Sequence, residues 1–392
     1  MSLDRRAFIK AALALGGLSL GRAWAWESSE EETGRLLVIF LRGGLDGLFA
    51  FSPVADPQFA SLRPSLSRTV LDRGIPLGDS GFVAHPACTP LADLYRSGEL
   101  AFAPCAGTID TSRSHFQAQD IFELGNGLSR GTSGFMSRAA SELGGEPGAI
   151  SFTGEVPLAF QGPTMPDVAQ LDTGRFQLPS GRLLEAVRRA HAGELTGTAL
   201  EQAIATEAAI AAALAEGGME PSSDRGAATV SGFVKVAQDM GRVLRRTPRF
   251  NLAFVDVGGF DTHANQEAVL SRALTTLSTG IVTLRRELGD IEWRRTRVLV
   301  CSEFGRTVRE NGTGGTDHGH GGLLLLAGGS VKGGRMLGSF HGLDKAHLNE
   351  GRDLPVHLDW RDALASSMRD CFLLPDAALD RILPNRPRHL EI

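Results

Sequence analysis

Tyrosine and cysteine are scarce in this chain of 392 residues, which has one tyrosine and four cysteines. Cys88, Cys105, Cys301 and Cys371 are too few and too scattered for a disulfide scaffold or a thiolate zinc site. Cys301 lies in an apolar run that predicts burial, whereas a pairing of Cys88 with Cys105 stays open. Forty-eight glycines beside the single tyrosine favour tight turns over a surface on which bases stack.

The N-terminal segment lacks the length of a membrane span but has the order of an export signal. It begins with the arginine pair Arg5 and Arg6, followed by the apolar Phe8 and by Lys10. An apolar run over residues 11–20 comes next and is too short to cross a bilayer as a helix. Residues 23–25 then form a small-x-small cleavage pattern. We predict a twin-arginine signal over residues 1–25 and folded export to the periplasm, with the twin-arginine translocase as partner. A frayed amphipathic helix is the alternative.

An excess of basic charge is also missing. The formal net charge is −5, and it becomes −8 without residues 1–25, which hold four basic residues and one acidic residue. Such an acidic protein is a poor candidate for binding nucleic acid or anionic lipid. We therefore expect no nucleic-acid partner and no stable membrane span, and we predict one domain over residues 26–392.

The order of apolar runs predicts the fold class. Short apolar runs bounded by glycine alternate with longer helical patterns, which is typical of an α/β fold with a largely parallel sheet covered by helices. The clearest predicted strands are 36–41, 100–105, 252–257, 298–301 and 323–326, and the predicted helices are 182–191, 200–216, 230–246 and 266–288. Residues 125–180, rich in glycine, proline and phenylalanine, are predicted to form an irregular insertion or small β cap.

Carboxylates and imidazoles follow the predicted strands, at the edge where open parallel sheets bind ligands. The chief candidates are Asp46, Asp261, His263, Glu303, His318 and His320, and Asp256 and Asp317 lie beside them in the sequence. Oxygen and imidazole ligands without thiols suit Zn, Mn or Mg, and their number allows one ion or two. Taken singly, Asp46 has an alternative role as a turn residue, Asp261 as a helix N-cap, and Glu303 as a buried partner of Arg306.

A hydroxyl nucleophile is expected near such a metal, at the start of a helix whose free N–H groups hold an anion. Ser114 is the leading candidate, with Ser112 and Thr111 behind it. Ser114 with Gln117 three residues later also fits a capping box, which is the structural alternative.

Several motifs resemble an exported bacterial family catalogued as domain of unknown function 1501. Besides the twin-arginine start, they are RGGLDG from Arg42, SRSHFQAQD from Ser112, GGFDTH from Gly258, SEFGRT from Ser302 and GTDHGHG from Gly315. The resemblance covers nearly the whole mature chain. It implies the alkaline-phosphatase-like superfamily, and with it a three-layer α/β/α sandwich that carries a binuclear metal site.

The resemblance also implies roles for single residues. Asp46 resembles the aspartate that follows the first strand, and Ser114 lies where the nucleophile of the superfamily begins a helix. Asp261 and His263 resemble the ligands of one metal position, with His318 or His320 as its late histidine.

One pair departs from the superfamily pattern. Glu303 and Phe304 fall where an adjacent Asp and His are usual. Because phenylalanine binds no metal, the second position recruits another ligand, such as Asp317 or His115, or it is weak or empty.

These patterns lead to a periplasmic metal-dependent hydrolase of phosphate or sulfate esters as the main hypothesis, acting on a small anionic ester or a modified envelope polymer. Ser114 would attack, and Arg113 and Arg306 would balance the oxyanion charge, although either arginine also fits an ordinary ion pair. The rival is a non-catalytic exported binding or assembly protein with a degenerate metal site. An oxidoreductase is disfavoured because no dinucleotide fingerprint follows a strand.

Overall fold

The computed structural model describes residues 34–144, 148–153, 156–162, 168–170, 185, 188–189, 201, 204–205 and 230–387. The predicted signal over residues 1–25 and most of the predicted helices 182–191 and 200–216 lie outside the described residues. No helix in the described part is long and apolar enough to cross a membrane.

The described residues form one large sheet with the strand order β11-β5-β10-β9-β1-β8-β6-β7. Its strands are β1 (Arg35–Leu41), β5 (Leu100–Gly107), β6 (Ala149–Ser151), β7 (Val168–Gln170), β8 (Leu252–Val257), β9 (Thr296–Ser302), β10 (Gly322–Ala327) and β11 (Leu358–Asp359). β10 runs antiparallel to β5 and β9, and the other neighbouring strands of this sheet pair in parallel. The sheet is therefore largely parallel, as the sequence predicts.

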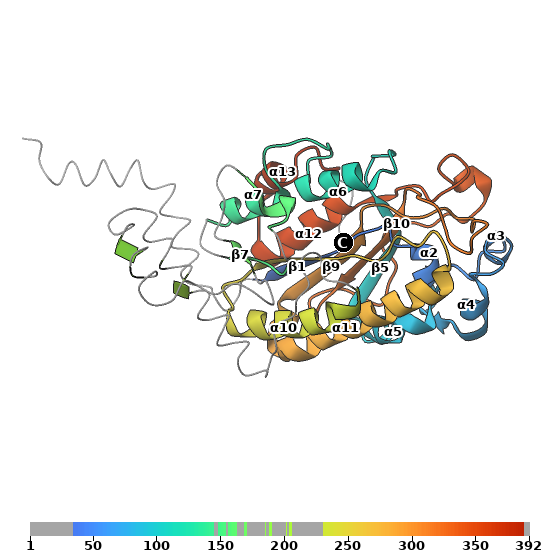
Figure 1. The fold of residues 1–392 in the computed structure, drawn as a ribbon, viewed down its shortest axis with the longest axis horizontal. Helices are drawn as coiled ribbons and strands as arrows, with labels where there is room; N and C mark the ends of the chain where they lie inside the picture. Colours follow the sequence, from blue (N-terminus) through green and yellow to red (C-terminus); the bar gives the residue numbers. More distant parts are fainter. Residues whose placement is uncertain are drawn as a thin grey trace, which may run out of the picture. The chain divides into compact units, whose positions relative to one another are not determined.

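Helices cover both faces of this sheet (Figure 1). On one face lie α5 (Thr89–Arg96), α10 (Phe233–Arg246) and α11 (Gln266–Arg294), and on the other lie α6 (His115–Leu124), α7 (Phe135–Glu142), α12 (Trp360–Phe372) and α13 (Asp376–Ile382). Beyond the sheet are α2 (Gly47–Ala50), α3 (Phe59–Leu62), α4 (Arg68–Arg73) and a small sheet of β2 (Phe51–Ser52), β4 (Val83–Ala84) and β3 (Ile75–Pro76). The predicted three-layer α/β/α sandwich is confirmed.

Strand β1 is apolar from Leu36 to Leu41 because both of its faces are buried. Leu37, Ile39 and Leu41 pack into the core on the α10–α11 face. Leu36, Val38 and Phe40 pack into the core on the α12 face. Successive side chains of a strand point to opposite faces, so a strand with helices on both sides needs a continuous apolar run instead of an alternating one.

The predicted elements that fall on described residues are present. Each of the five predicted strands matches a strand of the large sheet, and residues 230–246 and 266–288 are helical. Within residues 125–180, helix α7 joins a helical layer, and β6 and β7 extend the large sheet beside β8. All four cysteines are free and buried, so Cys88 and Cys105 are not paired.

The topology places the chemically interesting residues at one edge. Strands β9, β1 and β8 are adjacent and parallel, so the loops that follow Ser302, Leu41 and Val257 leave the sheet side by side. Strand β5 ends at the same edge, and its loop leads into α6. The residues that follow these strands form the site described below.

A partly buried ion pair ties α11 to the start of β5 and gives a stability prediction. The Glu99 carboxylate accepts from Arg285 Nε at 2.6 Å, from Arg285 Nη2 at 2.8 Å and from Trp293 Nε1 at 3.2 Å. The hydrogen bonds from Arg285 lower the pKa of Glu99 below its usual 4.5. Stability from this carboxylate is therefore present above pH 4.5 and is lost as the pH falls through the lowered value.

We expect Glu99→Gln to reduce the free energy of unfolding by about 1–2 kcal/mol at pH 7, because the charge-assisted contacts with Arg285 are lost. Urea unfolding at pH 7 and at successively lower pH checks this, and the difference from the parent should shrink below pH 4.5. Asp290→Asn, at the more exposed carboxylate 3.8 Å from Arg285, is the control and should change little. An equal loss in both variants would contradict the assignment.

Candidate metal centre

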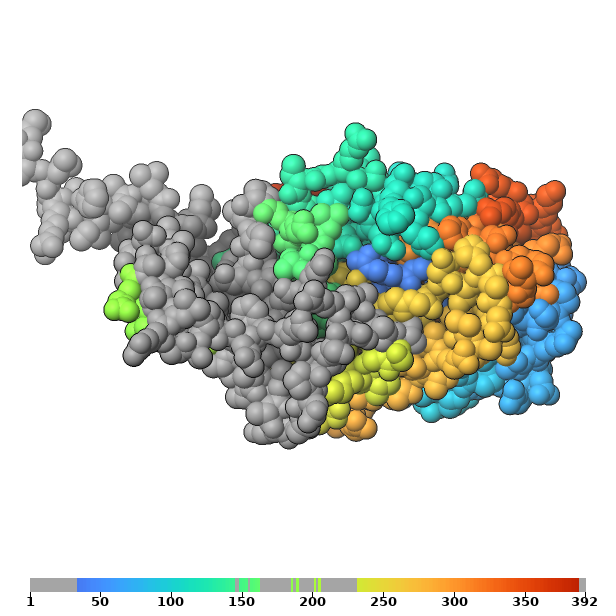
Figure 2. Space-filling view, in the orientation of Figure 1, coloured from blue at the N-terminus to red at the C-terminus, as the bar shows by residue number. Residues whose placement is uncertain are grey.

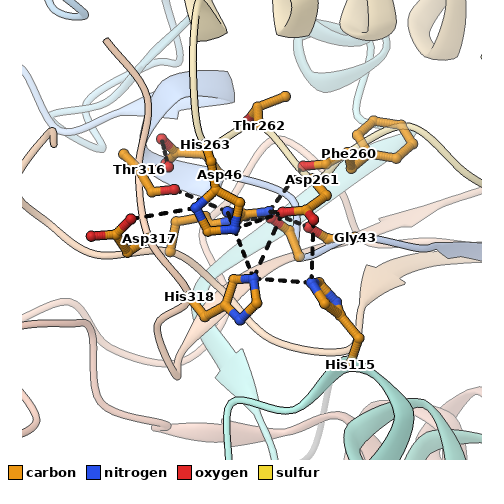
Figure 3. A network of polar contacts seen from close by, with 12 residues as sticks. Gly43, Asp46, His115, Phe260, Asp261, Thr262, His263, Thr316, Asp317 and His318 are labelled. Atoms are coloured by element: carbon orange, nitrogen blue, oxygen red, sulfur yellow. Dashed lines mark hydrogen bonds and ion pairs between the residues drawn. The ribbon is translucent and has the colours of Figure 1, made fainter. Parts of the chain in front are cut away.

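Three imidazoles and one carboxylate face one another at the sheet edge (Figure 3). His115 is the first residue of α6, Asp261 and His263 follow β8, and His318 precedes β10. His318 Nε2 lies 3.0 Å from His115 Nε2 and 2.9 Å from His263 Nε2. Asp261 Oδ1 lies 3.1 Å from His263 Nε2, and Asp261 Oδ2 lies 3.6 Å from His115 Nε2. The ligand atoms of His115, Asp261 and His318 all lie within 4.8 Å of one another.

The opposite nitrogen of each ring has an oxygen acceptor. The pairs are His115 Nδ1 with Glu303 Oε1 at 2.8 Å, His263 Nδ1 with Asp317 Oδ1 at 3.3 Å, and His318 Nδ1 with the Arg113 carbonyl oxygen at 2.9 Å. An acceptor at Nδ1 favours the tautomer that carries its proton on that nitrogen, and in this tautomer the Nε2 lone pair points toward the centre. Lone pairs about 3 Å apart repel unless a cation lies among them, which is the arrangement that divalent metals need.

The charges of the cluster also suit a cation. Burial, assisted by the positive charge of Arg306, lowers the pKa of His318, so this ring is neutral near pH 7. Burial opposes the charge of Asp261, but the hydrogen bond and the charge of Arg306 outweigh it and lower the pKa of that carboxyl. The cluster therefore offers a neutral imidazole beside an ionised carboxylate.

Arg306 is buried and holds Asp261 in place. Its Nη2 donates to Asp261 Oδ1, its Nε donates to the Gly44 carbonyl at 2.6 Å, and its Nη1 donates to the Thr316 carbonyl at 2.9 Å. The guanidinium is thus occupied by the protein itself. The predicted contact of Arg306 with a substrate oxyanion would need these bonds to be exchanged.

Glu303 lies behind His115. Its side chain is fully buried and accepts from His115 Nδ1, from Gln119 Nε2 at 3.0 Å and from the backbone N–H groups of Gly43 and Gly44 at 2.9 and 3.2 Å. Burial disfavours the charge, but the hydrogen bonds from His115 and Gln119 outweigh it and lower the pKa of Glu303. Glu303 therefore orients an imidazole, and its partner is not Arg306.

Phe304 forms a wall of the cluster. Its ring centroid lies 4.8 Å from that of His115 and 5.0 Å from that of His318. The absence of a side chain at Gly44 makes this packing feasible, because a Cβ there would lie 2.6 Å from Phe304 Cε2. The phenyl ring thus packs against two imidazoles and offers no ligand atom of its own.

Two predicted ligands lie apart from the cluster. Asp46 Oδ2 accepts from Arg63 Nη1 and from Gln266 Nε2, both at 2.7 Å, while Asp46 Oδ1 caps α2. His320 Nε2 donates to the Thr108 carbonyl at 2.7 Å. Among the described residues, neither side chain forms a hydrogen bond or ion pair with the three converging imidazoles.

Ser114 occupies the N-cap position of α6, directly before His115, but its side chain makes no cap hydrogen bond. The amide of Gln117 donates to Asp110 at 3.1 Å instead, so the capping box is not formed. Thr111 and Ser112 are exposed, and the Ser112 hydroxyl donates to Asp110. Ser114 therefore keeps a hydroxyl that the start of the helix does not use.

Arg113 contributes its backbone to the centre. With a φ of 55°, it turns its carbonyl oxygen toward His318 while its guanidinium donates to Glu350 at 2.7 Å and to Asp353 at 3.2 Å. Its side chain, which we predicted to bind an oxyanion, is paired with protein carboxylates.

The sequence reasoning gave His115 only a replacement role and did not single out Gln119. The four-residue spacing of His115 and Gln119 places both side chains on one face of α6, from which both reach Glu303. Gln119 Oε1 also accepts from Arg42 at 2.7 Å. The four-residue spacing within SRSHFQAQD is the sequence signal from which a shared role of His115 and Gln119 could have been predicted.

Comparison with known families settles which family the chain represents. A family model described as "Protein of unknown function (DUF1501)" matches residues 126–365. The chain belongs to this family. No curated protein matches it by sequence.

Solved structures similar to this DUF1501 chain include the PsFucS1 sulfatase from Pseudoalteromonas sp., with 11% identity, a TM-score of 0.41, and 92% of this chain and 72% of that chain covered. A protein in the alkaline phosphatase superfamily from Vibrio parahaemolyticus has 10% identity, a TM-score of 0.39, and coverage of 78% and 62%. The alkaline phosphatase from the Antarctic bacterium TAB5 has 10% identity, a TM-score of 0.35, and coverage of 78% and 95%.

His318 and His320, two residues apart in the segment GTDHGHG, allow a prediction with a matched control. We expect His318→Ala to lose bound divalent metal, because its Nε2 contacts both other imidazoles, whereas His320→Ala should retain metal in the folded fraction. Elemental analysis of each folded variant, with circular dichroism to establish folding, checks this. Loss of metal only from the His320 variant would reverse the assignment.

Glu303 gives a second prediction. Loss of a carboxylate that orients a ligating histidine typically weakens metal binding about 10-fold to 100-fold. We expect Glu303→Gln to show this loss in a chelator competition. Glu310→Gln, at a half-buried carboxylate that bonds Ser65 and Leu66, is the control and should bind metal like the parent. Unchanged affinity in Glu303→Gln would show that His115 needs no carboxylate partner.

Proposed function

We propose that this protein is a metal-dependent hydrolase of phosphate or sulfate esters, exported by the twin-arginine pathway to the periplasm. The observation that carries the proposal is the convergence of three imidazole Nε2 atoms beside Asp261, with an acceptor behind each ring. Such a donor set fits a divalent ion, and three imidazoles favour zinc over magnesium.

The proposed centre holds one ion. His115, His263, His318 and Asp261 would bind it. Of the residues expected for a second ion, Asp46 is paired with Arg63. Glu303 lies behind His115, and Phe304 offers no ligand atom.

A bound divalent ion would polarise the ester and lower the pKa of the attacking hydroxyl or water. Ser114 is the proposed nucleophile because its hydroxyl makes no cap bond and it directly precedes the ligand His115. The first N–H groups of α6 have no carbonyl partners within the helix, so they can accept a developing negative charge. Arg306 fixes Asp261, and Phe304 shields one side of the imidazoles from water.

The test combines metal content with turnover. We expect about one zinc per chain, and hydrolysis of 4-nitrophenyl phosphate or 4-nitrophenyl sulfate that stops on chelation and returns with zinc. Asp261→Asn should abolish turnover, since the ionised carboxylate faces all three imidazoles. Ser114→Ala should lower kcat at least about 100-fold if the hydroxyl attacks, and an unchanged kcat would assign the attack to a water.

The rival function, a non-catalytic exported binding protein, draws support from the two arginines. Arg113 pairs with Glu350 and Asp353, and Arg306 pairs with Asp261, so neither guanidinium is free for a substrate oxyanion. One stably bound metal per chain without turnover of any phosphate or sulfate ester would favour this rival. Two metal equivalents per chain would overturn the one-ion centre.

A further inference from the structure

A cleft of about 350 Å³ lies beside the proposed metal centre. Its walls come from α3, from the 307–311 loop, and from the chain between Leu343 and Arg352. This volume falls in the range of pockets that hold small organic ligands.

The cleft and the centre share a wall. Asp317 lines the cleft, and its Oδ1 pairs with His263 Nδ1 at 3.3 Å. Arg352 also lines the cleft, and its Nη2 donates to the His318 carbonyl at 2.9 Å. A ligand in the cleft would therefore lie one side chain away from two of the proposed metal ligands.

The acidic residues of the cleft are already paired. Glu310 accepts from the backbone N–H groups of Ser65 and Leu66 at 3.0 and 2.9 Å. Asp317 accepts from His263 and from Asn311 Nδ2 at 3.2 Å. Their charges are thus offset from within the protein.

Of the basic residues that line the cleft, Arg352 is paired with Asp353, whereas Arg309 and Lys345 are not paired in this way. Arg309 and Lys345 are exposed, and in the described part of the chain neither side chain forms an ion pair. Lys345 lies along the backbone of Gly351, where a Cβ would come within 2.8 Å of its Cγ and Cε. Gly351 has a φ of 63°, so a larger residue there would be strained as well as crowded. This bare backbone lets the lysine lie along the cleft wall.

The remaining lining includes an apolar surface. Leu62, Val308 and Leu343 are buried side chains that line the cleft, and Leu348 is half-buried beside them. An apolar surface with unpaired cations fits an organic anion whose ring or chain packs on the leucines while its charged group meets Arg309 and Lys345.

We propose that the cleft binds a second negatively charged group, carried on the alcohol part of the ester. The substrate class is then an ester with two separate anionic groups, one at the metal centre and one in the cleft. This inference rests on the proposed function for the identity of the ester, but binding in the cleft is independent of turnover.

The probe is 4-hydroxybenzoate, the alcohol that leaves 4-carboxyphenyl phosphate, with phenol as its uncharged match. Calorimetry on the full-length mature protein without added metal should detect 4-hydroxybenzoate and not phenol. The double variant Arg309→Gln with Lys345→Gln should weaken that binding about tenfold, because two charge-assisted contacts are lost. Lys332→Gln, at an exposed lysine in the segment that follows β10, is the control and should bind like the parent.

Turnover gives the second measurement. In the double variant kcat/KM for 4-carboxyphenyl phosphate should fall about tenfold, while kcat/KM for phenyl phosphate and the metal content stay unchanged. Equal binding of phenol and 4-hydroxybenzoate, no binding of 4-hydroxybenzoate, or an equal loss in the Lys332 variant would overturn the proposal. Selective binding without hydrolysis of either ester would support the cleft and reject the hydrolase, which separates the two failures.

Discussion

The buried carboxylate of Glu303 is the constraint on which the site depends. A charged group without solvent contact is costly unless hydrogen bonds replace its lost water. Glu303 takes those bonds from the backbone after β1 and from two side chains of α6. One ionised group thus joins the loops after β9 and β1 to α6, and it fixes the N-terminus of α6 where His115 faces the other imidazoles of the candidate metal centre.

Arg306 does the same for the other half of the site. It donates to backbone carbonyls at Gly43, Gly44 and Thr316 and to the carboxylate of Asp261. The loops after β1 and β8 and the loop before β10 are thereby tied to one guanidinium. Because Glu303 and Arg306 each bond the Gly43–Gly44 backbone, displacement of this turn would move both halves of the centre together.

Much of the fold follows from local sequence, and part of the centre does too. Continuous apolar runs such as 36–41 are short enough, and contain enough β-branched and aromatic residues, to be told from helices, and parallel pairing then brings their C-terminal ends together. That rule placed Asp261 and His263 at this edge, whereas His318 lies there because β10 runs antiparallel to β9, so that the loop before β10 meets the same edge. It gave no means of choosing between His318 and His320, because the direction of each side chain depends on the backbone of an irregular loop.

The role of His115 was harder to see for a different reason. It begins a helix after an irregular connection, and it meets the other imidazoles only because Glu303, 188 residues away in sequence, holds its Nδ1. Asp46 was predicted to bind metal because it follows the first strand, and this prediction is not met by its contacts. Its burial beside Arg63 instead makes it a partner that holds α2 and α11 through capping and Gln266. Such long-range pairings have no signature in local spacing.

Phe304 affects both the packing of the site and the cation that the site could bind. A ring at this position makes no hydrogen bond, so it can occupy the space beside Gly44 only by packing, and it packs against His115 and His318. An apolar wall lowers the local dielectric, which strengthens the attraction between an ion and the ionised Asp261 and raises the cost of leaving imidazole lone pairs without a cation. Phe304 adds no ligand atom of its own, but its apolar ring would strengthen the binding of a cation to Asp261 and the three imidazoles. In the proposed centre Phe304 would therefore favour one enclosed ion, and its presence does not by itself mark a decayed site.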